Sequence, residues 1–337
     1  CDEVTLELEP KPEGTQICSF STAMKMRAAL TYAFGRNLRI GKSQWTYGID
    51  GVWRGNPCVS DHVRRYMGGL SRRKAAAGEC PISSAALNLQ MLVQMWNSKN
   101  DYLRRAYTAP NYNFHRANYE DDWGGVLKRI AGWTIVLLAF RLLCRGIDIL
   151  KLRVENLYFN PQRDDHVHIR PFTRKSDQHG KVDGFDVYVE IDGKKMPLCI
   201  ARALSDWLTV SGIREGYLFP KIYGFNTLGG SESRMDQDDF LILFRHMLVD
   251  IGQDPKLFGV HALRRGGCQW MFRDCRMSLP VVLDWGSWSP NLTHAIILRY
   301  LVSDTDILQR PRSAYFDPWA QSSGDECRSC HRSCYCS

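Results

Sequence analysis

The chain has 337 residues, of which 44% are hydrophobic and 24% are charged. These proportions are ordinary for a globular protein and exclude a disordered or fibrous chain, and the length is sufficient for two domains. Lysine and arginine outnumber aspartate and glutamate by 44 to 36, giving a formal charge of +8; this excess favours a polyanionic partner, with a charged face that only keeps the protein soluble as the alternative.

No segment of the sequence has the pattern of a membrane span. The longest apolar run, WTIVLLAF at residues 133–140, is too short to cross a bilayer, and the first residues lack the charged-then-apolar pattern of a signal peptide. We therefore expect no membrane partner. The chain starts at Cys1 and not at methionine, which is consistent with a longer precursor.

The first third of the chain predicts helices. Residues 1–15 are acidic and contain proline, as an N-terminal arm would, and a helix is expected from residue 19 to Gly35. A second helix is expected over residues 60–77, because Val63, Met67 and Leu70 fall on one face at helical spacing. A third is expected from Ser83 or Ser84 to about Trp96.

The second predicted helix carries a cationic face opposite its apolar one. Arg65 and Arg72 are seven positions apart and share that face. The candidate polyanion-binding residues on this helix are Arg64, Arg65, Arg72, Arg73 and Lys74. A solvated charge stripe is the alternative interpretation.

The segment 110–122 is polar and without a periodic pattern, so we place a domain boundary there. The predicted organisation is an arm at 1–15, a helical domain at 16–109, the linker at 110–122, a second domain at 123–320 and a cysteine-rich tail at 321–337. The second domain reads as helical to about residue 159, then alternates as a β-hairpin would, and is helical again from Cys199. The fold class is therefore mainly α, in two domains, with a small antiparallel sheet.

The second domain spaces its reactive side chains widely, but each lies next to an apolar element that can hold it. They are Arg145, Lys175, His261, Arg264, Trp288 and Tyr300. His261 and Arg264 belong to HALRRGG, residues 261–267, and would occupy one helix face about a turn apart. Taken singly, each of the six has a structural explanation, such as a core histidine or a helix-end charge.

In this order, the six residues resemble the active site of the tyrosine recombinases, the phage-integrase family. CRGIDILKLRVENL contains the equivalent of the first family arginine, HALRRGG resembles the H-x-x-R box, GSWS the His/Trp box and RYL the nucleophile motif. The resemblance covers residues 123–303, and Asp148 stands where the family usually has glutamate. Residues 55–79 further resemble recombinases of fungal Crypton-type transposons.

The resemblance implies a metal-free and cofactor-free DNA strand transfer. Two guanidiniums, on Arg145 and Arg264, would stabilise the charge of the phosphodiester transition state. Tyrosine ordinarily has a pKa of about 10, so a base such as His261 would assist the attack by Tyr300. Lys175 would protonate the leaving 5′ oxygen, and the Trp288 indole would donate to the phosphate. The product would be a 3′-phosphotyrosyl enzyme.

One spacing departs from the family pattern. Trp288 and Tyr300 are 12 positions apart, longer than is usual, with PNLTH enlarging the link. The interpretation leaves two possibilities: Tyr300 is displaced, or its helix begins later. Tyr315 is the reserve nucleophile.

The expected partners are double-stranded DNA and further copies of the chain, as a dimer to tetramer on DNA. The function expected is site-specific recombination that integrates or excises a mobile element. The alternatives are a catalytically inactive DNA-binding protein and a type IB topoisomerase. The expected compartment is the nucleus in a eukaryote and otherwise the cytoplasm.

The twelve cysteines divide into two groups. Eight are scattered, several in apolar stretches, which predicts buried thiols in a reducing environment. The other four crowd the tail. There, Cys327, Cys330, His331 and Cys334 are weak candidates for a metal site, because a second, distant ligand pair is missing.

Overall fold

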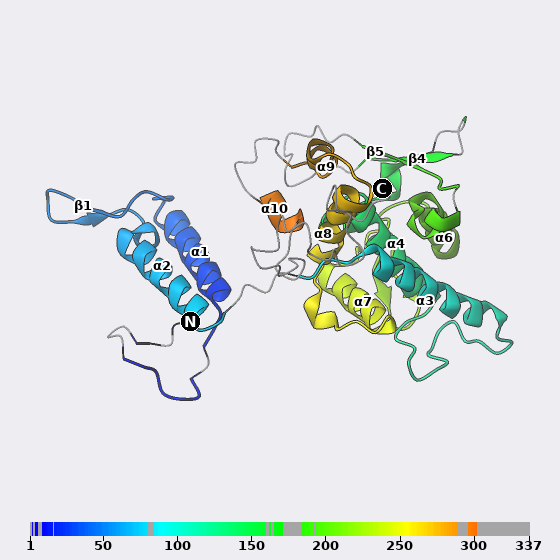
Figure 1. Ribbon diagram of the computed structural model, residues 1–337, viewed down its shortest axis with the longest axis horizontal. Helices are drawn as coiled ribbons and strands as arrows, with labels where there is room; N and C mark the ends of the chain where they lie inside the picture. The colour runs from blue at the N-terminus through cyan, green and yellow to red at the C-terminus, as the bar shows by residue number, and fades with distance from the viewer. Residues whose placement is uncertain are drawn as a thin grey trace, which may run out of the picture. The chain divides into compact units, whose positions relative to one another are not determined.

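The computed structural model describes residues 2, 4–5, 9–15, 17–79, 84–159, 162, 165–170, 184–191, 193–288 and 296–301. The chain divides into unit 1, Cys1–Ser83, and unit 2, Ser84–Ser337 (Figure 1). The described residues are mainly helical with small antiparallel sheets, which confirms the fold class expected from the sequence. Within them, no helix has the length and apolar character needed to span a bilayer.

Unit 1 is a helix pair with a short hairpin between its members. Its elements are α1 (Phe20–Asn37), β1 (Thr46–Tyr47), β2 (Trp53–Arg54), the 3-10 turn η1 (Pro57–Val59) and α2 (Asp61–Ala76). Both helices start at a serine whose side chain accepts a backbone N–H of the first turn, Ser19 from Thr22 and Ser60 from Val63. The helices were predicted within about two residues at each end; the hairpin was not predicted.

Unit 2 is built around α4 (Val126–Arg141), whose apolar sequence is buried on nearly every side. It packs against helices from before and after it in the chain, and Figure 1 shows α6, α7 and α8 around it. The helices of unit 2 are α3 (Leu89–Thr108), α4, α5 (Gly146–Leu150), α6 (Ile200–Ser211), α7 (Gln237–Asp250), α8 (His261–Gln269), α9 (Leu279–Trp285) and α10 (Ile296–Leu301), with short turns η2 (Val154–Asn156), η3 (Gly193–Leu198) and η4 (Pro255–Leu257) and a π-helical turn, η5 (Trp270–Asp274).

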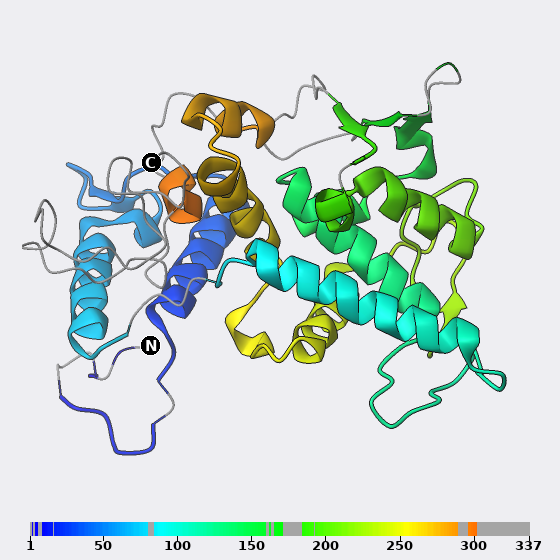
Figure 2. The same ribbon diagram turned by 45° about the vertical axis from the view of Figure 1, so that its right-hand side comes forward.

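The structure separates the two units after Ser83 and not at residues 110–122, where the sequence placed the boundary. Helix α3 belongs to unit 2, because Leu92, Met95 and Tyr102 are buried in the same core as α4. Figure 2 shows the long cyan helix α3 running alongside α4. Residues 110–122 form a loop within unit 2, in which Asn118 and Asp122 bond to the backbone.

The predicted β-structure is a three-stranded antiparallel sheet in the order β3 (Leu157–Phe159), β4 (His166–Ile169), β5 (Phe185–Tyr188). Alternate residues point to the core, as in the pairing of Val167 with Val187. Lys175 falls between β4 and β5, outside the described residues. A second hairpin, β6 (Ile222–Tyr223) with β7 (Thr227–Leu228), was not predicted.

Candidate active site

The HALRRGG segment forms α8, and its two glycines explain how deeply this helix is packed. A Cβ on Gly266 would overlap the carbonyl oxygen of Leu87, and a Cβ on Gly267 would overlap that of Phe140 at the end of α4. Only glycine therefore lets the backbone of α8 approach both segments. The consequence is that Arg264 is held in the interior with only 5% of its surface exposed.

Arg264 lies at the centre of a cluster of aromatic rings. Its Nη2 donates a hydrogen bond to the carbonyl oxygen of Gly286 at 2.8 Å. Its guanidinium carbon lies 4.2 Å from the ring centroid of Trp288 and 5.7 Å from that of Tyr300. The two rings lie 5.4 Å apart between centroids. The structure therefore brings together one residue from each of three sequence motifs. They are Arg264 of HALRRGG, Trp288 of GSWS and Tyr300 of RYL.

The long spacing between Trp288 and Tyr300 does not separate them. Tyr300 lies in α10 (Ile296–Leu301), and its ring is next to that of Trp288. The link itself, residues 289–295, and the reserve nucleophile Tyr315 lie outside the described residues.

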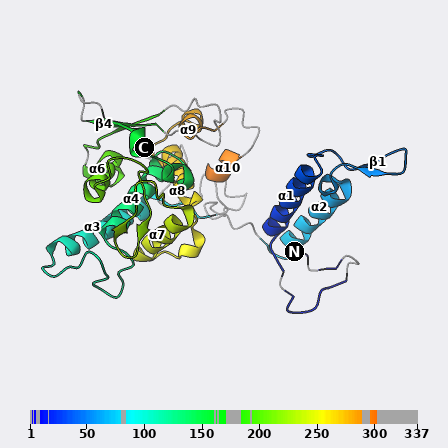
Figure 3. The same ribbon diagram turned by 180° about the vertical axis from the view of Figure 1, so that it is seen from behind.

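Two side chains that the sequence analysis missed hold the end of α10. Gln269 donates to the carbonyl oxygen of Tyr300 at 3.2 Å, and Arg273 donates to that of Leu301 at 2.9 Å. Leu301 also packs with the apolar residues around α8 and α9, and Figures 1 and 3 show α10 beside α8. Gln269 and Arg273 follow Arg264 by five and nine positions in the same helical segment, and this was the only signal that the sequence offered for them.

His261 begins α8 and has two cationic neighbours. Desolvation by the atoms packed around the ring, and then the positive charges of Arg264 and Arg145, lower the pKa of His261 below the ordinary histidine value. The imidazole is therefore neutral near pH 7 and able to accept a proton. It remains accessible, since His261 is an exposed residue.

Arg145 comes from the segment between α4 and α5 and lies near enough to His261 for its charge to act on the imidazole. Helix α4 ends at Arg141, and Arg145 is the N-cap of α5. The next residue, Gly146, packs against Val260, immediately before His261. One Arg145 nitrogen lies 3.8 Å from a carboxylate oxygen of Asp148.

The second arginine of HALRRGG has a different position from the first. Arg265 is also buried, and its Nη1 donates to the carbonyl oxygen of Ser84 at 2.9 Å. Ser84 in turn accepts the backbone N–H of Gly259 at 2.7 Å through its hydroxyl. Arg265 therefore fixes the start of unit 2 against α8.

Other predicted residues fall outside this cluster or outside the described residues. The segment carrying Lys175 and the tail candidates Cys327, Cys330, His331 and Cys334 are not described, and the described residues contain no group of metal-ligating side chains. The cysteines of the described segments are free thiols, and burial raises the pKa of Cys268, one turn after Arg264, to about 12.

The cationic residues of α2 divide between solvent and the interior of unit 1. Arg65 and Arg72 are exposed and form no ion pair within the described residues, whereas Arg64 pairs with Asp61 at 2.9 Å. Arg73 makes two hydrogen bonds to Asp2, of 3.2 and 2.5 Å. Lys74 was expected on the exposed face but is 7% exposed, because it follows Met67 and Leu70 at helical spacing on the apolar face.

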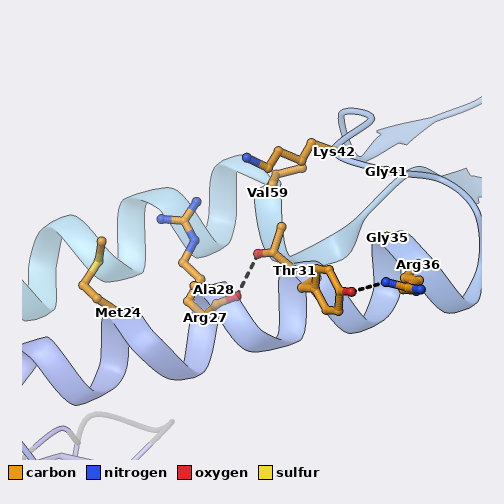
Figure 4. Close-up of a pocket in the computed structure, with 10 residues that line it drawn as sticks. Met24, Arg27, Ala28, Thr31, Gly35, Arg36, Gly41, Lys42 and Val59 are labelled. Atoms are coloured by element: carbon orange, nitrogen blue, oxygen red, sulfur yellow. Dashed lines mark hydrogen bonds between the residues drawn. The ribbon is translucent and has the colours of Figure 1, made fainter. Parts of the chain in front are cut away.

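A further cationic surface of unit 1 lies on α1. A groove of about 870 Å³ there is lined by apolar side chains and by the cations Arg27, Arg36 and Lys42 (Figure 4). The Arg27 Nε donates to the carbonyl oxygen of Cys58 at 3.1 Å, which ties α1 to η1. These three residues do not follow one another in the sequence, so no run of charges marked them as candidates.

No protein-family model matches the chain, and no curated protein matches its sequence. Among solved structures, the chain is similar to the XerH site-specific recombinase in a pre-cleavage complex with its difH substrate, at 12% identity over 85% of this chain and 63% of that one, with a TM-score of 0.47. It is also similar to a lambda integrase dimer bound to a COC′ core site, at 12% identity, with 84% and 59% covered and a TM-score of 0.41.

A third similar structure is the Tn1549 transposon integrase in complex with circular intermediate DNA, at 13% identity, with 82% and 95% covered and a TM-score of 0.34. In a post-cleavage XerH complex, this chain spans 50% of the matched chain. At TM-scores below 0.5 these likenesses do not decide a function, which is therefore inferred from the side-chain geometry around Arg264.

Proposed function

We propose that the protein cuts and rejoins DNA as a tyrosine recombinase, through a 3′-phosphotyrosyl intermediate on Tyr300. The observation that supports this most is the placement of Arg264 against both Trp288 and Tyr300. These residues come from separate segments of the chain, and all three belong to motifs that resemble those of the tyrosine recombinases.

In the proposed reaction, Arg145 and Arg264 bind one DNA phosphate, which the Tyr300 hydroxyl attacks. The two guanidiniums offer forked donors to the nonbridging oxygens, on which negative charge accumulates in the transition state. The Trp288 indole N–H adds a neutral donor. Because the guanidiniums are held by packed elements, little reorganisation accompanies the reaction.

We assign the proton transfers from the resemblance to the tyrosine recombinases. The Tyr300 oxygen attacks phosphorus while its proton passes to neutral His261, and the bond from phosphorus to the 5′ oxygen breaks. We assign protonation of that oxygen to Lys175. The covalent ester keeps the free energy of the phosphodiester, so a second 5′ hydroxyl reverses the step and joins a new strand without a nucleotide cofactor.

We infer that unit 1 contacts the DNA backbone through Arg65 and Arg72, which are exposed and available, and that Arg64, Arg73 and Lys74 contribute less. Phosphate contacts of this kind position a duplex without reading its sequence. We further infer that the DNA belongs to a mobile element of Crypton type, from the resemblance of residues 55–79, that the chain acts as a homo-oligomer on DNA, and that it acts in the nucleus of a eukaryotic host.

The test is a nicked suicide substrate that carries the DNA ends of the element. Wild-type protein is expected to form a covalent DNA adduct, Tyr300→Phe to form none, and the matched control Tyr315→Phe to retain it. Loss of the adduct in Tyr315→Phe alone would contradict the assignment of the nucleophile. Absence of any adduct on a site that the protein binds would support an inactive DNA-binding protein, and relaxation of plasmid without a target would support a topoisomerase.

A further inference from the structure

A cavity of about 300 Å³ lies in unit 2 among α3, α4, η3 and α6. The residues that line it include Trp96, Lys99, Trp133, Met196, Arg202 and Asp206. None of them belongs to the cluster around Arg264, which is formed by the segments from α8 to α10. The cavity therefore has a chemistry that the proposed reaction does not use.

Lys99 is the unusual member of this lining. Its residue surface is 6% exposed, and within the described residues its ammonium makes no hydrogen bond and no ion pair. The nitrogen lies 5.9 Å from the centroid of the Trp133 ring, a weak cation–π contact. Desolvation lowers the pKa of Lys99, with the charge of Asp206 opposing that shift.

A lysine whose side chain is almost entirely buried and makes so few polar contacts is costly unless a polar or charged group meets its ammonium. Such a group can reach Lys99 through the cavity, because Lys99 is one of the residues that line it. Asn100 and Ser205 also line the cavity and add polar atoms. A ligand that brings an anionic oxygen would supply the missing partner.

The other residues that line the cavity indicate the shape and charge of the rest of the ligand. Trp96 and Trp133 offer flat apolar surface to a ring. On α6, the exposed residues Arg202 and Asp206 lie one turn apart at the rim, so a second cation is available, while the carboxylate disfavours a ligand with several negative charges. The volume suits a molecule of one or two rings.

We propose that this cavity binds a small molecule with a flat apolar ring and a single phosphate or carboxylate group, with the anionic group paired to Lys99. The proposal is independent of the DNA strand transfer proposed above.

Isothermal titration of the full chain with benzoate, phenyl phosphate and neutral benzamide tests it. One of the two anions is expected to bind at least tenfold more tightly than benzamide, and which one does so distinguishes carboxylate from phosphate recognition. Lys99→Met, which keeps the length of the side chain, should weaken anion binding at least tenfold, whereas Lys256→Met at an exposed position should leave it unchanged.

Arg202→Gln provides a second variant, at an exposed position where folding is not at risk, and should weaken the same anion by about threefold. Equal affinity for benzamide and both anions, or unchanged binding in Lys99→Met, would overturn the proposal. Lys99→Met should form the DNA adduct at the normal rate. The experiment therefore distinguishes failure of the ligand-binding proposal from failure of the proposed strand transfer.

Discussion

Two segments of the chain look alike in sequence and differ in structure. HVRRYMGGLSRRK in α2 and HALRRGG in α8 each combine a histidine, paired arginines and paired glycines. In α2, Arg65 and Arg72 face solvent, and no atom lies within 4 Å of a Cβ built on Gly68. In α8, both arginines are buried and both glycines touch neighbouring backbone.

The difference shows what makes an arginine suited to a chemical step. A cation on a solvated helix face adds long-range attraction for phosphates but is free to reorient. Arg264 is fixed by close helix packing, a carbonyl and two rings, so its donors have one direction. Preorganisation of this kind is what stabilises a transition state.

The largest expected contrast is between arginine-to-lysine changes in the two helices. Arg264→Lys keeps the charge but loses the planar fork, and the rate of adduct formation should fall by roughly 10² to 10³-fold. Arg65→Lys should change it less than about twofold at low salt, because a phosphate contact in solvent depends mainly on charge. Single-turnover cleavage of the suicide substrate measures both, and comparable losses in the two variants would contradict the comparison.

Alanine substitutions at Gly267 in α8 and Gly68 in α2 should change the stability of the two helices in opposite directions. Gly267→Ala would force α8 away from α4, and overpacking of this kind costs about 1–3 kcal/mol. The amides of α8 should then exchange with deuterium roughly five- to hundredfold faster. Gly68→Ala should slow exchange in α2 by roughly two- to fivefold, since alanine stabilises a helix by about 0.5–1 kcal/mol over glycine. Mass spectrometry of peptides from the two helices reads both effects, and slower exchange of α8 in Gly267→Ala would show that its packing is looser than described.

The pH dependence of cleavage tests the neighbours of His261. The pKa of His261 is lowered, so its neutral form should persist below pH 6.5, and the rate should decline only at more acidic pH. Arg145→Gln removes a positive charge and should move the histidine pKa upward. A titration of the His261 ring by NMR checks this separately from activity. A pKa that is the same in both proteins would place Arg145 too far away to act on the histidine.

The smallest effect is expected from the exposed cations. If each contacts one phosphate, then Arg65→Ala and Arg72→Ala should each reduce the slope of log affinity against log salt by about 0.9. Arg73→Ala serves as a matched control on the same helix, because its guanidinium is bonded to Asp2. A greater loss of slope in Arg73→Ala than in the other two would reverse this assignment.

The parts of the fold and of the candidate site that a single local sequence pattern determines could be predicted from the sequence. The apolar run of α4 predicted a helix, and the motifs HALRRGG, GSWS and RYL contain Arg264, Trp288 and Tyr300, which the structure brings together. The boundary after Ser83 was missed because α3 and the loop at 110–122 look like a helix and a linker, while the packing of Leu92 and Tyr102 against α4 is tertiary. Arg265 was missed because its partner, the Ser84 carbonyl, is far away in the chain.

The most direct test of the central claim is X-ray diffraction from crystals of the protein soaked with tungstate, which mimics the phosphate. We expect one strong anomalous peak within hydrogen-bond distance of the guanidiniums of Arg145 and Arg264 and facing the Tyr300 hydroxyl. A structure in which tungstate binds elsewhere and this position holds none, with the two guanidiniums pointing apart, would contradict the account.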